Sequence, residues 1–485
     1  MIESESARNT PDQAAGEKPA RAPVDARELV EVGMLLVALI ATDFLLPRLL
    51  YGDGLARYQA LDQLLRTGTM PDTKYSLIMP LFAAPLWFLG ALSGNATQTE
   101  LQTQRFNPLL FGLTIIVFYV LLRRRMDGRI LRTFLLLLML ASMFPYNLTQ
   151  FYGEVFTAVF VALGLMIATL SAPLPKRLAR WALVALGVAN TPATLAGLAV
   201  VVGQRIWASK RWRYVAPLLA AGALIVSESL IRRGGLLTSG YEHDSGGNPA
   251  GPLIGGWLPG FNYPFLLGLL ALLFSFGKGL IFYAPGLFLP LKSRLRALGE
   301  QGAALWRVHV SWLCFSLGLL LIYASWWDWS GDWFWGPRFL LFASIPASFA
   351  LALWTQRPSA RLWVNLFALG ALALSFWVGI SGAVFGLADM SVCDVANTNA
   401  QSLCRFDPSY SALWRPYVNL VTYGPTAHFV AVEQLTLPGA IYGVVSLTIG
   451  IYLAIPLLTA ITRQTRALLA EHTPLIRERL AAIRL

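Results

Sequence analysis

An aspartate stands at the start of a short amphipathic segment in this 485-residue chain, directly after its first long apolar run. From Gly54 to Thr67, apolar residues recur at three- and four-residue steps with charged residues between them, which predicts a helix lying on a membrane surface. Gly68 is placed to end this helix. Asp53 precedes it, so the carboxylate could cap free amide groups. The same carboxylate also has the chemistry of a general base.

Three cationic side chains could hold an anion near this aspartate. Arg338 follows a Trp-rich stretch, in the sequence "GPR", and Lys278 begins an apolar run in the sequence "FGKG". Each could instead extend a long side chain from the bilayer to the membrane surface. Arg57 lies one turn beyond Asp53 and could simply pair with it.

Acidic and aromatic residues near the same runs could contact a polar substrate. Glu154 lies at the end of an apolar run, and an acid at membrane depth is a functional candidate by default, although a buried hydrogen bond between helices would also explain it. Asp328 and Asp332 lie four residues apart among tryptophans, where they could bind sugar, bind a divalent ion or remain solvated. The other candidates are Trp335, His243 and His428, and the two histidines are too isolated to form a zinc motif.

The composition predicts an all-α polytopic membrane protein. Hydrophobic residues make up 56% of the chain, charged residues 13%, and the mean hydropathy is +0.57. A soluble domain of this length does not have such a composition. The net charge of +12 is explained by Lys and Arg in cytosolic loops and does not require a nucleic-acid partner.

Basic clusters predict the orientation of the chain. Because positive residues favour the cytosol, we expect the clusters at 123–129, 175–180, 205–213, 292–296, 357–361 and 463–466 to face inward. The apolar runs between them predict about twelve membrane segments with both termini inside. These segments are 29–50, 107–122, 131–149, 152–171, a broken pair at 181–204, 214–231, 276–291, 306–326, 339–355, 361–384 and 437–461.

Residues 75–93 are apolar enough for a further span, but counting them would place 123–129 outside, so we expect them to lie along or partly within the outer leaflet.

The predicted organisation is a cytosolic tail at 1–27 without signal-peptide features, a membrane domain at 28–462 and a cytosolic tail at 463–485. The predicted outward loops are 51–106, 232–275, 327–338 and 385–436. The long first and last loops favour function on that face.

Two of the three cysteines lie in the last predicted outward loop. Cys393 and Cys404 are eleven residues apart on a face that we expect to be oxidising, which predicts one structural disulfide. A metal pair is the alternative, although no His or further Cys stands at ligand spacing. Cys314 falls within a span.

The first predicted outward loop resembles that of the GT-C glycosyltransferases, a superfamily that includes protein O-mannosyltransferases, aminoarabinose transferases and arabinofuranosyltransferases. The matching residues are Asp53, Tyr58, Gly68, Pro71, Pro80 and Pro85. Three further stretches resemble segments of bacterial GT-C-like proteins: "NLTQFYGEVF" (147–156), "LLFSFGKGLIFYAPGLFLPL" (272–291) and "WWDWSGDWFWGPRFLLFASIPA" (326–347). Many members carry a second acid beside the first, whereas Gly54 occupies that position here.

The resemblance implies a GT-C-like bundle with extracytoplasmic loop helices in a bacterial inner membrane. It implies an inverting transfer of sugar from a polyprenyl-phosphate donor to an envelope glycan, lipid or protein, with Asp53 as base and Tyr58 near the substrate. Arg338, Lys278 and Arg57 would bind the donor phosphate. No cofactor is firmly implied, and a divalent cation is compatible with the site. The alternatives are a flippase of lipid-linked sugars and an O-antigen polymerase or ligase.

Overall fold

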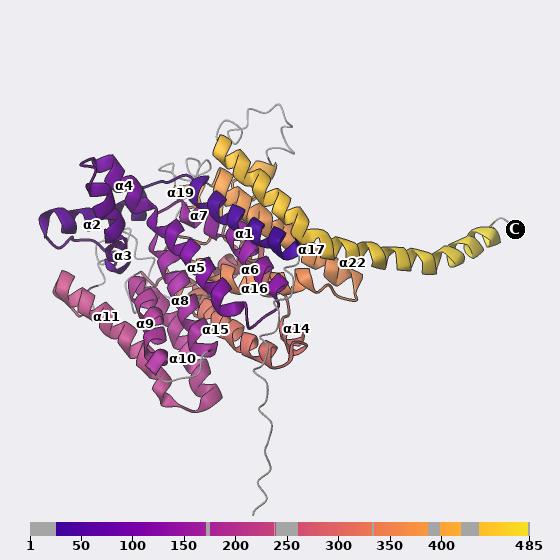
Figure 1. Cartoon of the computed structure of the whole chain (residues 1–485), viewed down its shortest axis with the longest axis horizontal. Helices are drawn as coiled ribbons and strands as arrows, with labels where there is room; N and C mark the ends of the chain where they lie inside the picture. Colours follow the sequence, from indigo (N-terminus) through magenta and orange to yellow (C-terminus); the bar gives the residue numbers. More distant parts are fainter. Residues whose placement is uncertain are drawn as a thin grey trace, which may run out of the picture.

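The computed structural model describes residues 26–170, 175–236, 238, 260–331, 334–386, 398–418 and 436–483. Figure 1 shows a helical body from which the C-terminal part of α22 projects. The larger helices are α1 (Ala26–Phe44), α2 (Gly52–Thr67), α3 (Ile78–Ala91), α4 (Ala96–Gln104), α5 (Phe106–Leu122), α6 (Gly128–Leu140), α8 (Gly153–Leu170), α9 (Pro175–Asn190), α10 (Leu195–Ser209), α11 (Ala216–Arg233), α12 (Phe265–Phe274), α15 (Gly299–Tyr323), α16 (Ser344–Gln356), α17 (Leu362–Ile380), α19 (Thr398–Phe406) and α22 (Leu437–Ile483). Shorter elements are α7 (Phe144–Leu148), α13 (Leu280–Tyr283), α14 (Lys292–Arg296), η1 (Pro192–Thr194), η2 (Trp212–Val215), η4 (Pro285–Phe288), η5 (Arg338–Ala343) and η6 (Ser381–Phe385).

Seven helical segments in the described part of the chain are long and apolar enough to cross a membrane. They are Ala96–Leu122, Gly153–Leu170, Trp212–Arg233, Gly299–Tyr323, Arg338–Gln356, Leu362–Phe385 and Leu437–Glu471. Each contains or overlaps one of the predicted spans. The chain is therefore an all-helical, multi-pass membrane protein in the residues described, but the predicted count of about twelve is not confirmed.

The predicted span at 276–291 is wrong as a continuous helix. It divides into the short elements α13 and η4, because glycines precede α13 and Pro285 and Pro290 interrupt the backbone hydrogen bonding that a helix needs. The predicted span at 131–149 is also divided. α6 ends at Leu140, Ala141 has non-helical angles (φ −125°, ψ 45°), and Pro145 begins the separate turn α7.

The segment at 75–93 forms only the 14-residue helix α3. At 1.5 Å per residue, this helix is about 21 Å long, which is shorter than the roughly 30 Å hydrocarbon layer. α3 packs on α4, where Gly90 lies against the backbone of Thr99. Its place in the outer leaflet remains a prediction.

Contacts join several of the basic clusters that are predicted to face the cytosol. Arg294 of α14 donates to the Arg357 carbonyl, and Gln464 donates to the Ser359 carbonyl over 2.7 Å. Arg125 donates to the carbonyl of Leu170. The clusters at 292–296, 357–361 and 463–466 therefore lie together in space, as a shared membrane face requires.

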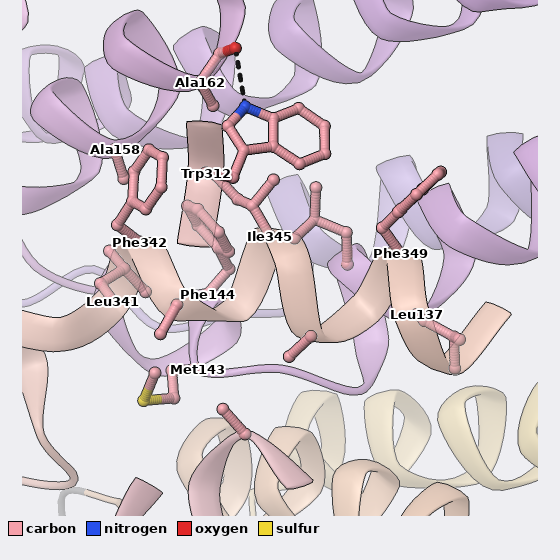
Figure 2. Close-up of a cluster of buried hydrophobic side chains, with 14 of the residues drawn as sticks. Leu137, Met143, Phe144, Ala158, Ala162, Trp312, Leu341, Phe342, Ile345 and Phe349 are labelled. Carbon is pink, nitrogen blue, oxygen red and sulfur yellow. Dashed lines mark hydrogen bonds between the residues drawn. The ribbon is translucent and has the colours of Figure 1, made fainter. Parts of the chain in front are cut away.

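The helices η5 and α16 contribute side chains to a buried apolar core. In Figure 2, Leu341, Phe342, Ile345 and Phe349 lie in one cluster with Trp312, whose indole donates to the Ala162 carbonyl. These side chains are at most 2% exposed. Close packing of this kind restricts side-chain and backbone movement, so the segment that begins with Arg338 is anchored by the residues that follow it.

Candidate active site

The centre of the site is an ion pair between Asp53, the predicted base, and Arg338, a predicted phosphate ligand. Arg338 Nη1 lies 2.7 Å from Asp53 Oδ2, and the two side chains are 5% and 22% exposed. Glu154 Oε1 lies 4.0 Å from the same nitrogen. The arrangement brings together α2, η5 and the first turn of α8.

The backbone before α2 places Asp53 in the first helical turn. Tyr51 is the N-cap residue, with extended angles, and α2 ends at Gly68 in the left-handed conformation. The predicted helix and its C-cap are therefore confirmed, and its place on the membrane surface stays a prediction. Gly52 has φ +54°, and a Cβ at this position would lie 3.0 Å from Phe334. Glycine adopts this conformation without steric cost.

The capping interpretation of Asp53 is replaced by side-chain pairing. The Tyr75 hydroxyl donates to Asp53 Oδ1 over 2.6 Å, while Arg338 lies against the other oxygen. Burial by itself would raise the pKa of Asp53, but the Arg338 guanidinium and the Tyr75 hydroxyl outweigh it and lower the pKa below its ordinary value. The carboxylate is therefore ionised at neutral pH and available to accept a proton.

Aromatic rings enclose the Arg338 guanidinium. Its Cζ lies 4.5 Å from the ring centre of Phe334, 5.0 Å from that of Phe339 and 5.2 Å from that of Tyr152. Such contacts attract a cation to the ring face. They hold the guanidinium in one orientation.

Arg57 adds a second buried cation near Asp53. The residue is 6% exposed, and its Nη1 donates to the Ser76 carbonyl over 3.3 Å. Its Cζ lies 4.7 Å from the ring centre of Tyr75. A Cβ on Gly153 would lie 2.9 Å from the guanidinium, so the absence of a side chain there makes room for Arg57. Arg57 contributes to lowering the Asp53 pKa.

Lys278 has a different environment from the one expected of a phosphate ligand. It is 4% exposed, and its Nζ donates to the Phe334 carbonyl and, over 3.1 Å, to the Gly336 carbonyl. Trp335, between those two residues, is 1% exposed and packs against Tyr146 and Tyr283 with ring centres 5.2 and 5.1 Å apart. Lys278 and Trp335 therefore stabilise the 334–338 loop through its carbonyls and through ring packing.

Of the other predicted substrate contacts, Asp328 lies near enough to Arg338 for its charge to act on the guanidinium, whereas Tyr58 lies apart. Asp328 is 9% exposed, accepts a hydrogen bond from Ser330 and lies 3.6 Å from Arg405. Tyr58 belongs to a separate apolar cluster with Leu61 and Trp87, where burial raises the pKa of its hydroxyl to about 12. Asp332, His243, His428 and Cys393 lie outside the described residues, so their predicted roles and the predicted disulfide with Cys404 stay predictions.

Sequence reasoning missed four tyrosines at the site. Tyr75 contacts Asp53 directly. The Tyr51 hydroxyl lies 3.5 Å from that of Tyr146, and Tyr152 lies on Arg338. Tyr51 and Tyr152 each stand two residues before a candidate, Asp53 and Glu154 respectively, and this spacing was the available signal.

The described residues contain no group of three or more His, Cys, Asp or Glu side chains that could hold a metal ion. Asp53 and Glu154 are two acids, but Arg338 Nη1 contacts one and lies near the other. A divalent cation there would have to compete with a fixed positive charge. The described part of the site therefore favours an anionic ligand over a metal.

No protein-family model matches this chain, and no curated protein matches it. Two solved structures are similar to it: ArnT from Cupriavidus metallidurans in the apo state, and the same protein bound to undecaprenyl phosphate. The first is 16% identical, with a TM-score of 0.48 over 93% of this chain and 80% of that one. The second is 15% identical, with a TM-score of 0.49 over 92% and 79%. At these values the likeness concerns the course of the helices, and the chemistry of the site depends on its own side chains.

Proposed function

We propose that this protein is an inverting glycosyltransferase that takes a sugar from a polyprenyl-phosphate donor and delivers it to a hydroxyl of an envelope glycan, lipid or protein. The observation that carries the proposal is the close pair of half-buried Asp53 and buried Arg338. An ionised carboxylate and a guanidinium that is held by aromatic rings lie 2.7 Å apart. Transfer from a phosphate leaving group needs one of each.

The reaction is a single displacement. Asp53 takes the proton of the acceptor hydroxyl while the acceptor oxygen bonds to the anomeric carbon. The bond from that carbon to the phosphate oxygen breaks on the opposite face of the sugar, so the configuration inverts. The electron pair leaves with the polyprenyl phosphate, and the proton on Asp53 later passes to water.

Arg338 has two partners during this cycle. Before the donor arrives it stabilises the Asp53 carboxylate, and the donor phosphate then competes for the same guanidinium. Weakening the ion pair raises the pKa of Asp53 and makes the carboxylate a stronger base when substrate is present. Arg57, buried beside Asp53, supplies a second positive charge for the phosphate.

The site lies away from the basic clusters. Figure 1 shows α2, which carries Asp53, well apart from α14, which carries the cluster at 292–296. The clusters at 357–361 and 463–466 lie together with that cluster. With those clusters in the cytosol, the site faces the periplasmic side of a bacterial inner membrane, where polyprenyl-linked sugars can reach it through the bilayer.

The decisive experiment uses purified protein in liposomes with synthetic polyprenyl-phosphate pentose and hexose donors and a membrane extract as the acceptor source. We expect labelled sugar to enter the extract and free polyprenyl phosphate to be released, and both to be lost in Asp53→Asn. Movement of intact lipid-linked sugar across the bilayer without release of polyprenyl phosphate would instead show a flippase.

A further inference from the structure

Residues 71–77, the second part of the connection between α2 and α3, form a segment that we call the strap. The strap carries Tyr75, whose hydroxyl donates to Asp53 Oδ1 over 2.6 Å. It also carries Ser76, whose carbonyl accepts a hydrogen bond from Arg57. The orientation of the Asp53 carboxylate therefore depends on a segment outside regular secondary structure.

The last two turns of α11 bind the strap through charged side chains. Arg232 donates over 2.7 Å to the carbonyls of both Thr73 and Tyr75. Glu228 accepts hydrogen bonds from the Ser76 hydroxyl and the Leu77 amide, over 2.7 and 2.8 Å. Arg233 donates to the carbonyls of Thr73 and Lys74, over 3.1 and 3.0 Å.

These contacts are partly buried and mutually dependent. Glu228 and Arg232 form a 2.7 Å ion pair, and their side chains are 16% and 2% exposed. Removal of either charge would leave the other inside the protein without compensation, which is costly. Because the planar guanidinium of Arg232 bonds two strap carbonyls and Glu228 together, an ammonium group cannot reproduce its geometry.

We propose that Glu228 and Arg232 are positioning residues that hold the strap so that Tyr75 orients the Asp53 carboxylate. For its catalytic consequence, the inference rests on the proposed function. It assigns to the end of α11 a role in proton transfer that acts through the strap. A merely structural role would leave the ionisation of Asp53 unchanged in folded protein.

The groups that set the ionisation of Asp53 come from several elements. Arg338, Arg57 and Tyr75 act on its carboxylate, and Glu154 and Tyr152 lie around Arg338. Arg232→Lys keeps every one of these charges. A shift in the pH profile of this variant therefore reports the geometry of Tyr75 and not a changed electrostatic field.

The first test is a double-mutant comparison of kcat against pH, with the synthetic polyprenyl-phosphate donors. Tyr75→Phe removes a hydrogen bond that favours the ionised carboxylate, so the acid limb should move to higher pH by about one unit. Arg232→Lys should move it in the same direction. The double variant should show no further shift of the acid limb, because both changes remove the same interaction, the hydrogen bond from Tyr75 to Asp53. An acid limb for Arg232→Lys that coincides with the parent overturns the proposal.

The second test does not depend on catalysis. Trypsin can cut after Lys74 only when the strap opens. Arg232→Lys should be cut several-fold faster than the parent, and Tyr75→Phe, which leaves the α11 contacts intact, should be cut more slowly than Arg232→Lys. Arg66→Lys is the matched control, since Arg66 forms an ion pair with Asp62 at the same i,i+4 spacing but half exposed on α2.

The two tests separate the possible failures. If the parent releases no polyprenyl phosphate, the proposed function fails, and the rate of cutting at Lys74 still decides whether α11 holds the strap. If the parent transfers sugar but Arg232→Lys is cut at the parental rate, the proposed function stands and the positioning role is overturned.

Discussion

Arg338 forms its ion pair with Asp53 from the first residue of η5, while Asp53 occupies the first turn of α2. The relationship joins two segments far apart in the chain, and each is fixed by its own surroundings. Gly52 turns the chain into α2, and the apolar core behind η5 anchors the residues after Arg338. A small movement of either segment would separate the base from its cation, so both anchors matter to the chemistry.

Asp53→Asn removes the proton acceptor but keeps the size of the side chain. We expect the protein to fold and its turnover to fall by roughly 10²–10⁴, the usual cost of losing a general base. The measurements are thermal unfolding in detergent and sugar transfer from a saturating donor. Near-parental turnover in folded Asp53→Asn protein would remove Asp53 from the role of base.

Arg338→Lys keeps the positive charge but loses the planar donor geometry. We expect roughly a tenfold loss of turnover for this variant, and a loss of about 10²–10³ or more for Arg338→Ala, because charge on the leaving phosphate grows in the transition state. Donor affinity should weaken in both. Unchanged donor affinity and turnover in Arg338→Ala would place the phosphate site elsewhere.

The sequence predicted that Asp53, Glu154 and Arg338 stand near one another better than it predicted their individual partners. Asp53, Glu154 and Arg338 all stand near ends of apolar runs, and hydropathy together with the basic clusters places these ends on one side. Lateral packing of helices is not encoded in hydropathy. For that reason the sequence did not predict that Lys278 bonds to the Phe334 and Gly336 carbonyls, and its predicted role at the phosphate stays a prediction.

Tyr75 was missed for a related reason. It lies in the strap, which has no helical or strand periodicity, and its contact with Asp53 depends on how α11 holds that strap. The broken segment at 276–291 was, by contrast, open to prediction. Its glycines and its two prolines are strong helix-breaking signals, whereas apolar content alone favours a span across them.

Cys393 and Cys404 should be bridged in the native protein. Cys404 belongs to α19, and the carbonyl of Arg405 accepts a hydrogen bond from the Gly277 amide. A disulfide closing this short loop should stabilise the loop more than the helical bundle. Mass spectrometry of unreduced peptides should find the crosslink, whereas free alkylation of both thiols without reductant would contradict it.

Glu154→Gln tests which acid is the base. Glu154 lies 4.0 Å from Arg338 Nη1, against 2.7 Å for Asp53. Removing its charge should leave the Asp53 pair intact and make Arg338 more attractive to phosphate. We therefore expect a lower donor KM and less than about a tenfold change in kcat. A loss of kcat as large as that of Asp53→Asn would assign proton transfer to Glu154 as well.

Lys278→Met distinguishes a phosphate ligand from a support of the 334–338 loop. The buried ammonium donates to two carbonyls of that loop, and each carbonyl left unsatisfied costs about 1–3 kcal/mol. We expect a lower unfolding temperature and a reduced kcat, since Phe334 packs on both Arg338 and Tyr51, while donor affinity stays within about threefold of the parent. Arg338→Ala is the matched comparison, because its donor affinity should fall. If Lys278→Met instead loses donor affinity with an unchanged unfolding temperature, Lys278 binds the phosphate as the sequence predicted.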